Sequence, residues 1–124
     1  MRLSEELRSR CKKFGSQVIR FYIGLPRKRE EVAVLGKQLL RAGTSVAAHA
    51  REASRARSTA EFCSKLDGLL QEADESQLWL EFLRDDCGIS GDVNGLHSEA
   101  GELIAIFTTM VSRLRRGDYD AEKS

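Results

Sequence analysis

The stretch 38-QLLRAGTSVAAHAREASRARS-58 is rich in alanine and arginine and has almost no large apolar residue after Leu40. Its apolar positions continue a pattern that begins before it and that recurs in steps of three and four residues, as one face of an α-helix does. This stripe consists of Val32, Leu35, Leu39, Ala42, Val46, His49 and Ala53. The stretch is therefore expected to be helical, within a helix over residues 30–56.

Three similar stripes lie on either side of this helix. The first consists of Leu3, Leu7, Cys11, Phe14, Val18, Phe21 and Leu25. The next after the quoted stretch consists of Phe62, Leu66, Leu69, Ala73, Ser76, Leu80, Leu83 and Cys87. The last consists of Leu96, Ala100, Leu103, Phe107, Met110 and Leu114. They predict helices over residues 3–25, 59–87 and 93–116.

Residues that start or stop helices lie between these stripes. Pro26 is expected to end the first helix, since proline excludes helical geometry from the residue before it. Ser58 and Glu61 have the spacing of a capping box, which predicts that a helix begins there. Gly88 and Gly117 occupy the position where a left-handed glycine commonly ends a helix. Four long helices with mostly short connections predict an all-α protein, an antiparallel up-down four-helix bundle.

Length and composition predict one domain over residues 1–124. The chain is 41% hydrophobic and 31% charged with a single proline, which disfavours disorder. No run is long and apolar enough to span a membrane and the N-terminus lacks a signal-peptide core, so a cytoplasmic location without membrane contact is expected. Cys11, Cys63 and Cys87 form no C-x-x-C pair, and we expect reduced thiols that make neither a disulfide nor a zinc site.

Charge is unevenly distributed along the chain although the net charge is only +1. Residues 27–57 carry eight Lys and Arg against three Asp and Glu, whereas residues 58–87 carry two against eight. These charges either neutralise each other within the fold or between subunits, or leave a basic face for phosphate. The candidate nucleic-acid-binding residues are Lys12, Lys13, Arg27, Lys28, Arg29, Arg51, Arg55 and Arg57. No base-reading motif accompanies them, so any binding is expected to be sequence-indifferent and salt-sensitive.

The second and third predicted helices each show a second patterned face. On the second it consists of Gln38, Arg41, Ser45, Ala48, Glu52 and Arg55, and on the third of Lys65, Gly68, Glu72, Glu75, Trp79 and Phe82. A bundle helix needs one buried face, so the extra pattern predicts a contact with another copy of the chain, or else a wider core. We expect Arg41 and Glu52 to be largely buried and paired, with Arg41 engaging a carboxylate of the third helix. The predicted polar cluster or subunit interface is Gln38, Arg41, Ser45, His49, Glu52, Lys65, Glu72, Glu75 and Trp79.

His49 lies on the apolar stripe and is expected to be a neutral, hydrogen-bonded core histidine. A metal site with nearby glutamates is disfavoured, because di-iron bundles need two Glu-x-x-His motifs and the pair formed by His49 and Glu52 is reversed. No phosphate loop, H-E-x-x-H motif or nucleophile elbow occurs. A hydrolase built on Glu72 and Glu75 is the enzymatic alternative, although these residues are better interpreted as partners for arginine. We therefore expect no catalytic residues, no metal and no cofactor.

The two middle helices also resemble a known family. The matching pieces are Gln38-Leu39-x-Arg41-Ala42, Ser45-Val46, Glu52-Ala53, Ser58 with Glu61-Phe62, Lys65-Leu66, Glu72-Ala73-x-Glu75 and Trp79-Leu80. This combination resembles the bacterial four-helix-bundle family that includes proteins encoded in intervening sequences of 23S ribosomal RNA genes. The resemblance implies a ring-like homopentamer without known catalytic residues. His49 is a departure, since the family commonly has asparagine there.

The resemblance also bears on partners. Related accessory proteins of diversity-generating retroelements bind nucleic acid and a reverse transcriptase through a basic surface. This implies RNA, DNA, a reverse transcriptase or another nucleic-acid-handling protein as partners. The sequence therefore predicts a non-catalytic, self-assembling bundle that binds nucleic acid or a protein that handles it. A purely structural or protein-interaction scaffold remains the alternative.

Overall fold

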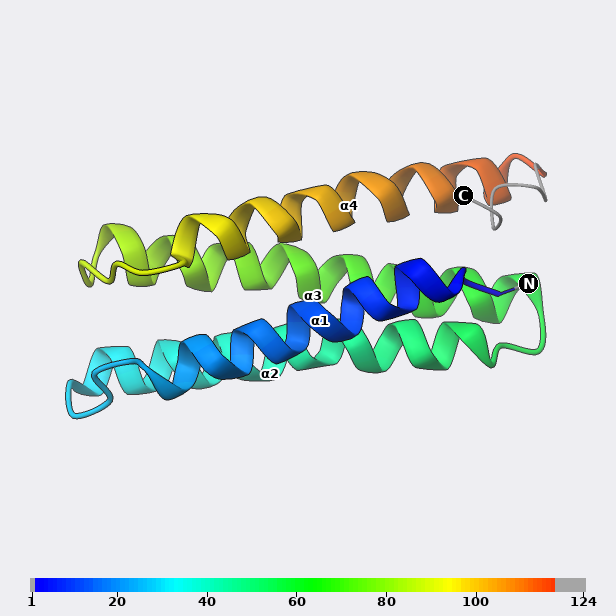
Figure 1. The fold of residues 1–124 in the computed structure, drawn as a ribbon. Helices are drawn as coiled ribbons and strands as arrows, with labels where there is room; N and C mark the ends of the chain where they lie inside the picture. Colours follow the sequence, from blue (N-terminus) through cyan, green and yellow to red (C-terminus); the bar gives the residue numbers. More distant parts are fainter. Residues whose placement is uncertain (1, 118–124) are drawn as a thin grey trace.

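The structure, a computed structural model, describes residues 2–117. Its four helices are α1 (Glu5–Ile23), α2 (Glu30–Ser54), α3 (Thr59–Asp85) and α4 (Val93–Arg115). They run alternately in opposite directions, so that the start of α1 and the end of α4 lie at the same end of the bundle (Figure 1). Within the described residues no strand occurs, which confirms the predicted all-helical class with four helices. None of these helices is long and apolar enough to cross a membrane.

All of the predicted helix boundaries hold to within two residues. The Ser58 hydroxyl accepts a hydrogen bond from the Glu61 amide at 3.0 Å, as the capping-box pattern predicted. Gly88 follows α3 in the left-handed conformation, with φ of 70°. The first helix ends earlier than predicted, at its cap residue Gly24 rather than beside Pro26. Glycine is a weak helix former, so the helix ends before the proline is reached.

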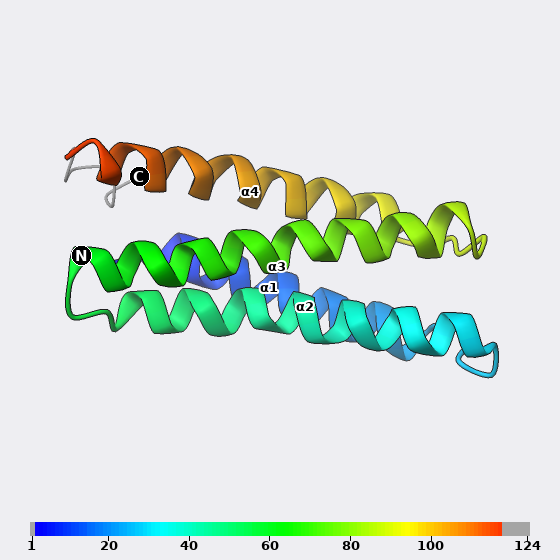
Figure 2. The same ribbon diagram turned by 180° about the vertical axis from the view of Figure 1, so that it is seen from behind.

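The helices occupy the corners of a four-membered bundle. From the front, α1 lies between α2 and α4, and α3 lies behind it, as the reverse view confirms (Figures 1 and 2). Successive helices pack closely, whereas α1 and α4 make the smallest contact among the helices that adjoin each other. The largest buried side chains fill the space between them: Phe14, Phe62, Phe107, Leu39, Leu66, Leu80, Leu83 and Leu103. The predicted stripes thus form most of the core, although Phe21 and Leu35 are only partly buried and Ala50 rather than His49 is buried in α2.

Glycines bring α1 and α2 together. A methyl group added to Gly43 would lie 2.7 Å from a methyl of Val18, and one added to Gly36 would lie 2.9 Å from a methyl of Leu25. Gly15 meets the same part of α2 at ordinary contact distance, 3.5 Å from the carbonyl oxygen of Gly43. Because these positions lack side chains, the two backbones approach closely. The exposed sides of α1 and α2 therefore form one continuous surface.

Candidate nucleic-acid interface

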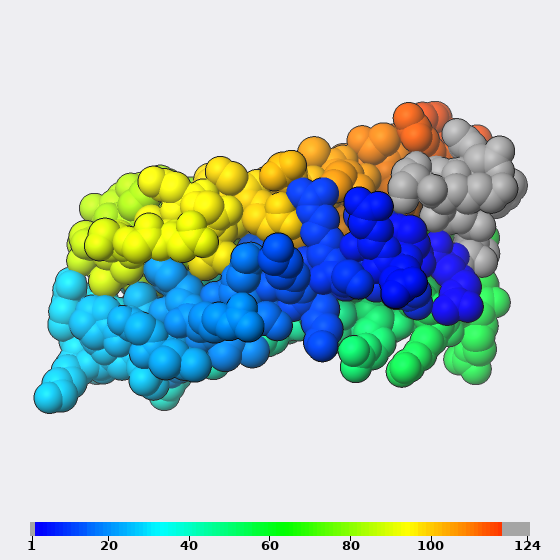
Figure 3. All heavy atoms as spheres, viewed as in Figure 1, coloured from blue at the N-terminus to red at the C-terminus, as the bar shows by residue number. Residues whose placement is uncertain are grey.

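The fold places the cationic part of the sequence on one half of the molecule. Residues 7–29 and 32–51, which make up most of α1 and α2, contain no aspartate or glutamate. In contrast, residues 58–87, which form α3, contain eight. The space-filling view shows α1 and the loop that follows it exposed along the front, with α4 above them (Figure 3). The surface formed by the middle of α1 and α2 is thus basic.

Many cations of this half are exposed and have no acidic partner among the residues that the structure describes. We call the following set the basic surface: Lys12, Lys13, Arg20, Lys28, Lys37, Arg51 and Arg55. Lys13 and Arg20 are seven residues apart on α1, and Lys37 and Arg51 are fourteen apart on α2, spacings that keep each pair on the same side of its helix. Their charges are therefore available to a ligand.

Two of the predicted binding residues have other contacts. The Arg27 guanidinium lies over the Tyr22 ring, 4.8 Å from its centroid. The Arg29 Nε donates to a Glu31 carboxylate oxygen at 2.8 Å, and its Nη1 donates to the Cys87 carbonyl at 3.0 Å. Arg29 thus fixes the α1–α2 loop against the α3–α4 loop, and it contributes less free charge than the sequence suggested.

Two members of the basic surface were not predicted from the sequence, and one predicted residue lies at its edge. Arg20 and Lys37 are exposed and unpaired in the described part of the chain, yet they were not among the candidates. The absence of acids from their segments is the signal that could have identified them. Arg57 lies at the α2–α3 turn, where its Nε is 3.8 Å from a Glu61 carboxylate oxygen. That contact is loose, so Arg57 lies at the edge of the basic surface.

A polar network joins α2 to α3 on a different face. The Arg41 Nη1 lies 2.9 Å from a Glu72 carboxylate oxygen, and its Nη2 lies 2.7 Å from a Glu75 oxygen. Hydrogen bonds to Glu72 and Glu75 raise the pKa of Arg41. Gln38 lies beside it, 3.5 Å from the Arg41 Nε. The predicted pairing of Arg41 with α3 is present, but its burial was wrong: the side chain is 49% exposed, because its long stem reaches across the outside of the bundle.

Glu52 and His49 also differ from their predicted environment. Glu52 is 51% exposed rather than buried, and its carboxylate lies 3.8 Å from the Lys65 Nζ. The His49 ring lies against Gly68, where an added methyl would come within 2.7 Å of it. Its Nδ1 is 3.4 Å from a Glu52 oxygen without hydrogen-bond geometry. His49 is therefore not a hydrogen-bonded core residue, because a glycine on α3 leaves space for the ring at the helix interface while Ala50 fills the core position.

Apolar side chains are exposed at the other end of the α2–α3 face. Trp79 is half-buried against the core, as the wider-core alternative predicted, whereas Phe82, which that alternative also placed in the core, is exposed. Their ring centroids lie 6.2 Å apart. Arg41 pairs with Glu72 and Glu75, and α2 and α3 run in opposite directions. Val34, seven residues before Arg41, is therefore expected at the level of Phe82, seven residues after Glu75. We call Val34, Leu78 and Phe82 the apolar patch, since all three are large and exposed. Isolated exposed apolar residues are ordinary, but a group at one helix interface is typical of a contact site.

The acidic residues of the enzymatic alternative lie in the polar network. Both carboxylates of the alternative hydrolase, Glu72 and Glu75, bind the guanidinium of Arg41. Across residues 2–117, no group of three or more potential ligands is placed to hold a metal ion. The chemistry that the surface offers is charge pairing and apolar contact.

Comparison with known proteins identifies the family. The chain matches the 23S rRNA-intervening sequence protein family over residues 5–109. It belongs to that family. Four chains of solved structures are similar to this member of the 23S rRNA-intervening sequence protein family. One is a protein of unknown function from the S23 ribosomal protein family of Bacteroides thetaiotaomicron VPI-5482, 30% identical with a TM-score of 0.77 over 85% of this chain and 97% of that chain. No curated protein matches.

The family assignment confirms the resemblance drawn from the two middle helices. The 23S rRNA-intervening sequence protein match also extends over α1 and most of α4, so it includes every residue of the basic surface. Neither the family description nor the solved structure assigns an activity. A function must therefore be argued from the chemistry of the surface.

Proposed function

We propose that this chain is a non-catalytic, self-assembling helical bundle that binds nucleic acid through its basic surface. One observation carries the proposal: the middle of α1 and α2 contains no acidic residue, and most of its exposed cations, Arg41 excepted, have no acidic partner in the described residues. Uncompensated charge raises the local concentration of anions, and phosphate neutralisation releases counterions from nucleic acid. The surface thus fits a polyanion better than it fits a neutral partner.

The shape of the surface supports the same ligand. A helix of 19 residues, the length of α1, spans roughly 28 Å, which is long enough to meet several successive phosphates on a strand. The cations lie on long side chains that adapt to the backbone. No helix presents a base-reading motif, so binding is expected to depend on salt and to be indifferent to sequence.

The binding proposal is tested by fluorescence anisotropy with labelled RNA and DNA at about 50 mM salt, where phosphate contacts are strongest. Lys37→Gln with Arg51→Gln should weaken binding to both. Arg113→Gln with Arg116→Gln removes the same charge from α4 and should leave binding nearly unchanged. Equal losses from both pairs would show that net charge alone attracts the ligand, whereas no binding by the unmodified protein would overturn the proposal.

The apolar patch supports the self-assembly half of the proposal. A second copy that covers Val34, Leu78 and Phe82 would remove apolar surface from water, and the exposed Ala48 on the same side of α2 lets a neighbouring helix approach. The expected assembly is a ring of identical subunits, five by family resemblance.

Light scattering coupled to gel filtration measures the assembly directly. Phe82→Glu should shift the mass toward monomer, because it places a charge in the subunit contact. Ile23→Glu, an equally large change at a more exposed residue of α1, should leave the mass unchanged. An assembly that forms normally but never retains nucleic acid would favour the alternative scaffold function.

A further inference from the structure

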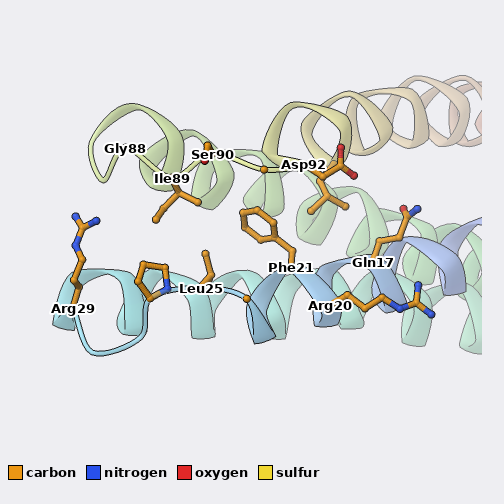
Figure 4. A pocket seen from close by; sticks show the side chains of 13 residues that line it. Gln17, Arg20, Phe21, Leu25, Arg29, Gly88, Ile89, Ser90 and Asp92 are labelled. Carbon is orange, nitrogen blue, oxygen red and sulfur yellow. The ribbon is translucent and has the colours of Figure 1, made fainter.

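A groove lies at one end of the bundle, beside the basic surface. Its volume is about 750 Å³, and it is bounded by the end of α1, the α1–α2 loop, the α3–α4 loop and the start of α4 (Figure 4). We call it the end groove. Neither the polar network nor the apolar patch contributes a residue to it.

The end groove exists because the contact between α1 and α4 is held at one place only. Along the contact, Arg10 of α1 binds Glu99 at 2.8 Å and Glu102 at 3.3 Å, and this holds the two helices together. No such bridge is found at the groove, where the α3–α4 loop carries Gly88 and Gly91 in the left-handed conformation. An added methyl on either glycine would have nothing within 4 Å, so both glycines border open space.

Part of the lining of the end groove is apolar and includes an aromatic ring. Phe21 and Leu25 point into the space from α1 and its loop, and Ile89 points toward them from the opposite loop (Figure 4). Phe21 is only partly buried, so its ring is accessible. A flat ring facing an aliphatic side chain offers the sandwich in which unstacked nucleobases bind.

Polar groups flank the ring. Gln17 and Arg20 lie toward one end of the lining and Arg29 toward the other (Figure 4). Arg29 is fixed by its two hydrogen bonds, while its Nη2 has no partner in the described residues. Asp92, the one acid that lines the groove, can accept a hydrogen bond from an exocyclic amino group, and Gln17 can donate and accept.

We propose that an unpaired base of a bound strand enters the end groove and stacks on Phe21, while the flanking phosphates meet Arg20 and Arg29. The inference rests on the proposed function, because it adds a preference for single strands to a surface that otherwise contacts only phosphates. Charge complementarity selects the occupant: Arg20 belongs to the basic surface, and Lys28 lies in the loop beside the groove, so a strand on that surface leads into it. A base inside a duplex is stacked on its neighbours and cannot reach the ring.

The first test compares a labelled single-stranded RNA with its duplex by fluorescence anisotropy. The unmodified protein should bind the single strand at least about five-fold more tightly, the lower end of the effect of one base–aromatic stack. Phe21→Leu keeps the groove apolar but removes the ring, and it should abolish this preference while leaving duplex binding unchanged. Phe107→Leu makes the same change in the core of α4 and should preserve the preference.

The second test needs no variant. A single strand carrying 5-iodouracil is cross-linked to the unmodified protein by light, and the attached peptide is identified by mass spectrometry. Cross-links should fall on residues 21–27, which include Phe21, or on residues 88–96. Equal affinity for single strand and duplex, or cross-links confined to segments around Lys12 and Arg51, would overturn the end-groove proposal while leaving the proposed function intact. Absence of any binding would overturn both.

Discussion

The α1–α2 half and the α3–α4 half of this bundle use charge in opposite ways. Acids of α3 and α4 bind cations that come from other helices, as Glu72 and Glu75 bind Arg41 and as Glu99 binds Arg10. The middle of α1 and α2 has no acids, so most of its exposed cations have no partner within residues 2–117. Acids in one half therefore hold the fold together, whereas cations in the other exceed what the fold uses. This surplus is what a ligand can bind.

The largest expected effect comes from reversing charge in the α1–α2 half. Lys12→Glu with Arg51→Glu should lower nucleic-acid affinity by roughly a hundred-fold or more at low salt, because two phosphate contacts are replaced by repulsion. The matched control, Arg113→Glu with Arg116→Glu in α4, should lower affinity far less. Both double variants change the net charge by four, and anisotropy titrations compare their affinities for nucleic acid. A larger loss of affinity in the α4 control would reverse our assignment of the two halves.

The glycine contact between α1 and α2 should be the next most sensitive feature. Gly43→Ala should destabilise the fold by about 1–2 kcal/mol, since overpacking against stiff Val18 outweighs the gain in helix propensity. Gly15→Ala meets only ordinary contacts and should be neutral or stabilise by up to about 1 kcal/mol. Urea unfolding of both variants gives the two free energies of unfolding. Similar values for both would show that α1 and α2 do not approach as closely as described.

Arg41 links the two halves, and its removal should have a moderate effect. Arg41→Ala should cost about 1 kcal/mol rather than the 3–5 kcal/mol of a buried pair, because water screens a half-exposed guanidinium. Arg57 is 91% exposed and lies 3.8 Å from Glu61, so Arg57→Ala should not change the melting temperature measurably. If the two variants melt alike, the Arg41 network contributes nothing to stability.

The smallest expected effect concerns the buried thiol of Cys11. Burial raises the pKa of Cys11 in α1 to about 12, so the folded protein keeps this thiol neutral while an unfolded chain ionises it near pH 9. Its contribution to stability is complete below about pH 9 and is lost as pH rises toward 12. Iodoacetamide at pH 8 should therefore modify Cys11 only through unfolding. Cys11→Ala should lessen the alkaline loss of stability, and rapid labelling of Cys11 in the native state would contradict its burial.

The sequence predicted the parts of the molecule that depend on local pattern. The apolar stripes and the Ser58 cap specified four helices, because periodicity and capping act within a few residues. The predicted core position of His49 was wrong because a three-four pattern fits His49 and Ala50 almost equally well. Gly68 on another helix decides which of the two is buried. The predicted burial of Arg41 was wrong for a similar reason, since periodicity does not show where the end of a long side chain lies.

The binding surfaces depend on distant segments and were only partly predictable. Most members of the basic surface could be identified by charge, but Arg20 and Lys37 required counting acids that are absent. The end groove could not be predicted, because it forms where Phe21 near the end of α1 and Ile89 of the α3–α4 loop line the same space. Loop placement is set by the packing of whole helices, which no short motif encodes.

The most direct measurement of the central claim is the salt dependence of nucleic-acid binding by the unmodified protein. Affinity for a labelled RNA is measured by anisotropy from about 50 to 200 mM salt, and its logarithm is plotted against that of the salt concentration. Several phosphate contacts on the basic surface predict a straight line with a slope steeper than about −2. No binding at the lowest salt, or binding with a slope near zero, would contradict the claim that surplus cations on α1 and α2 bind nucleic acid.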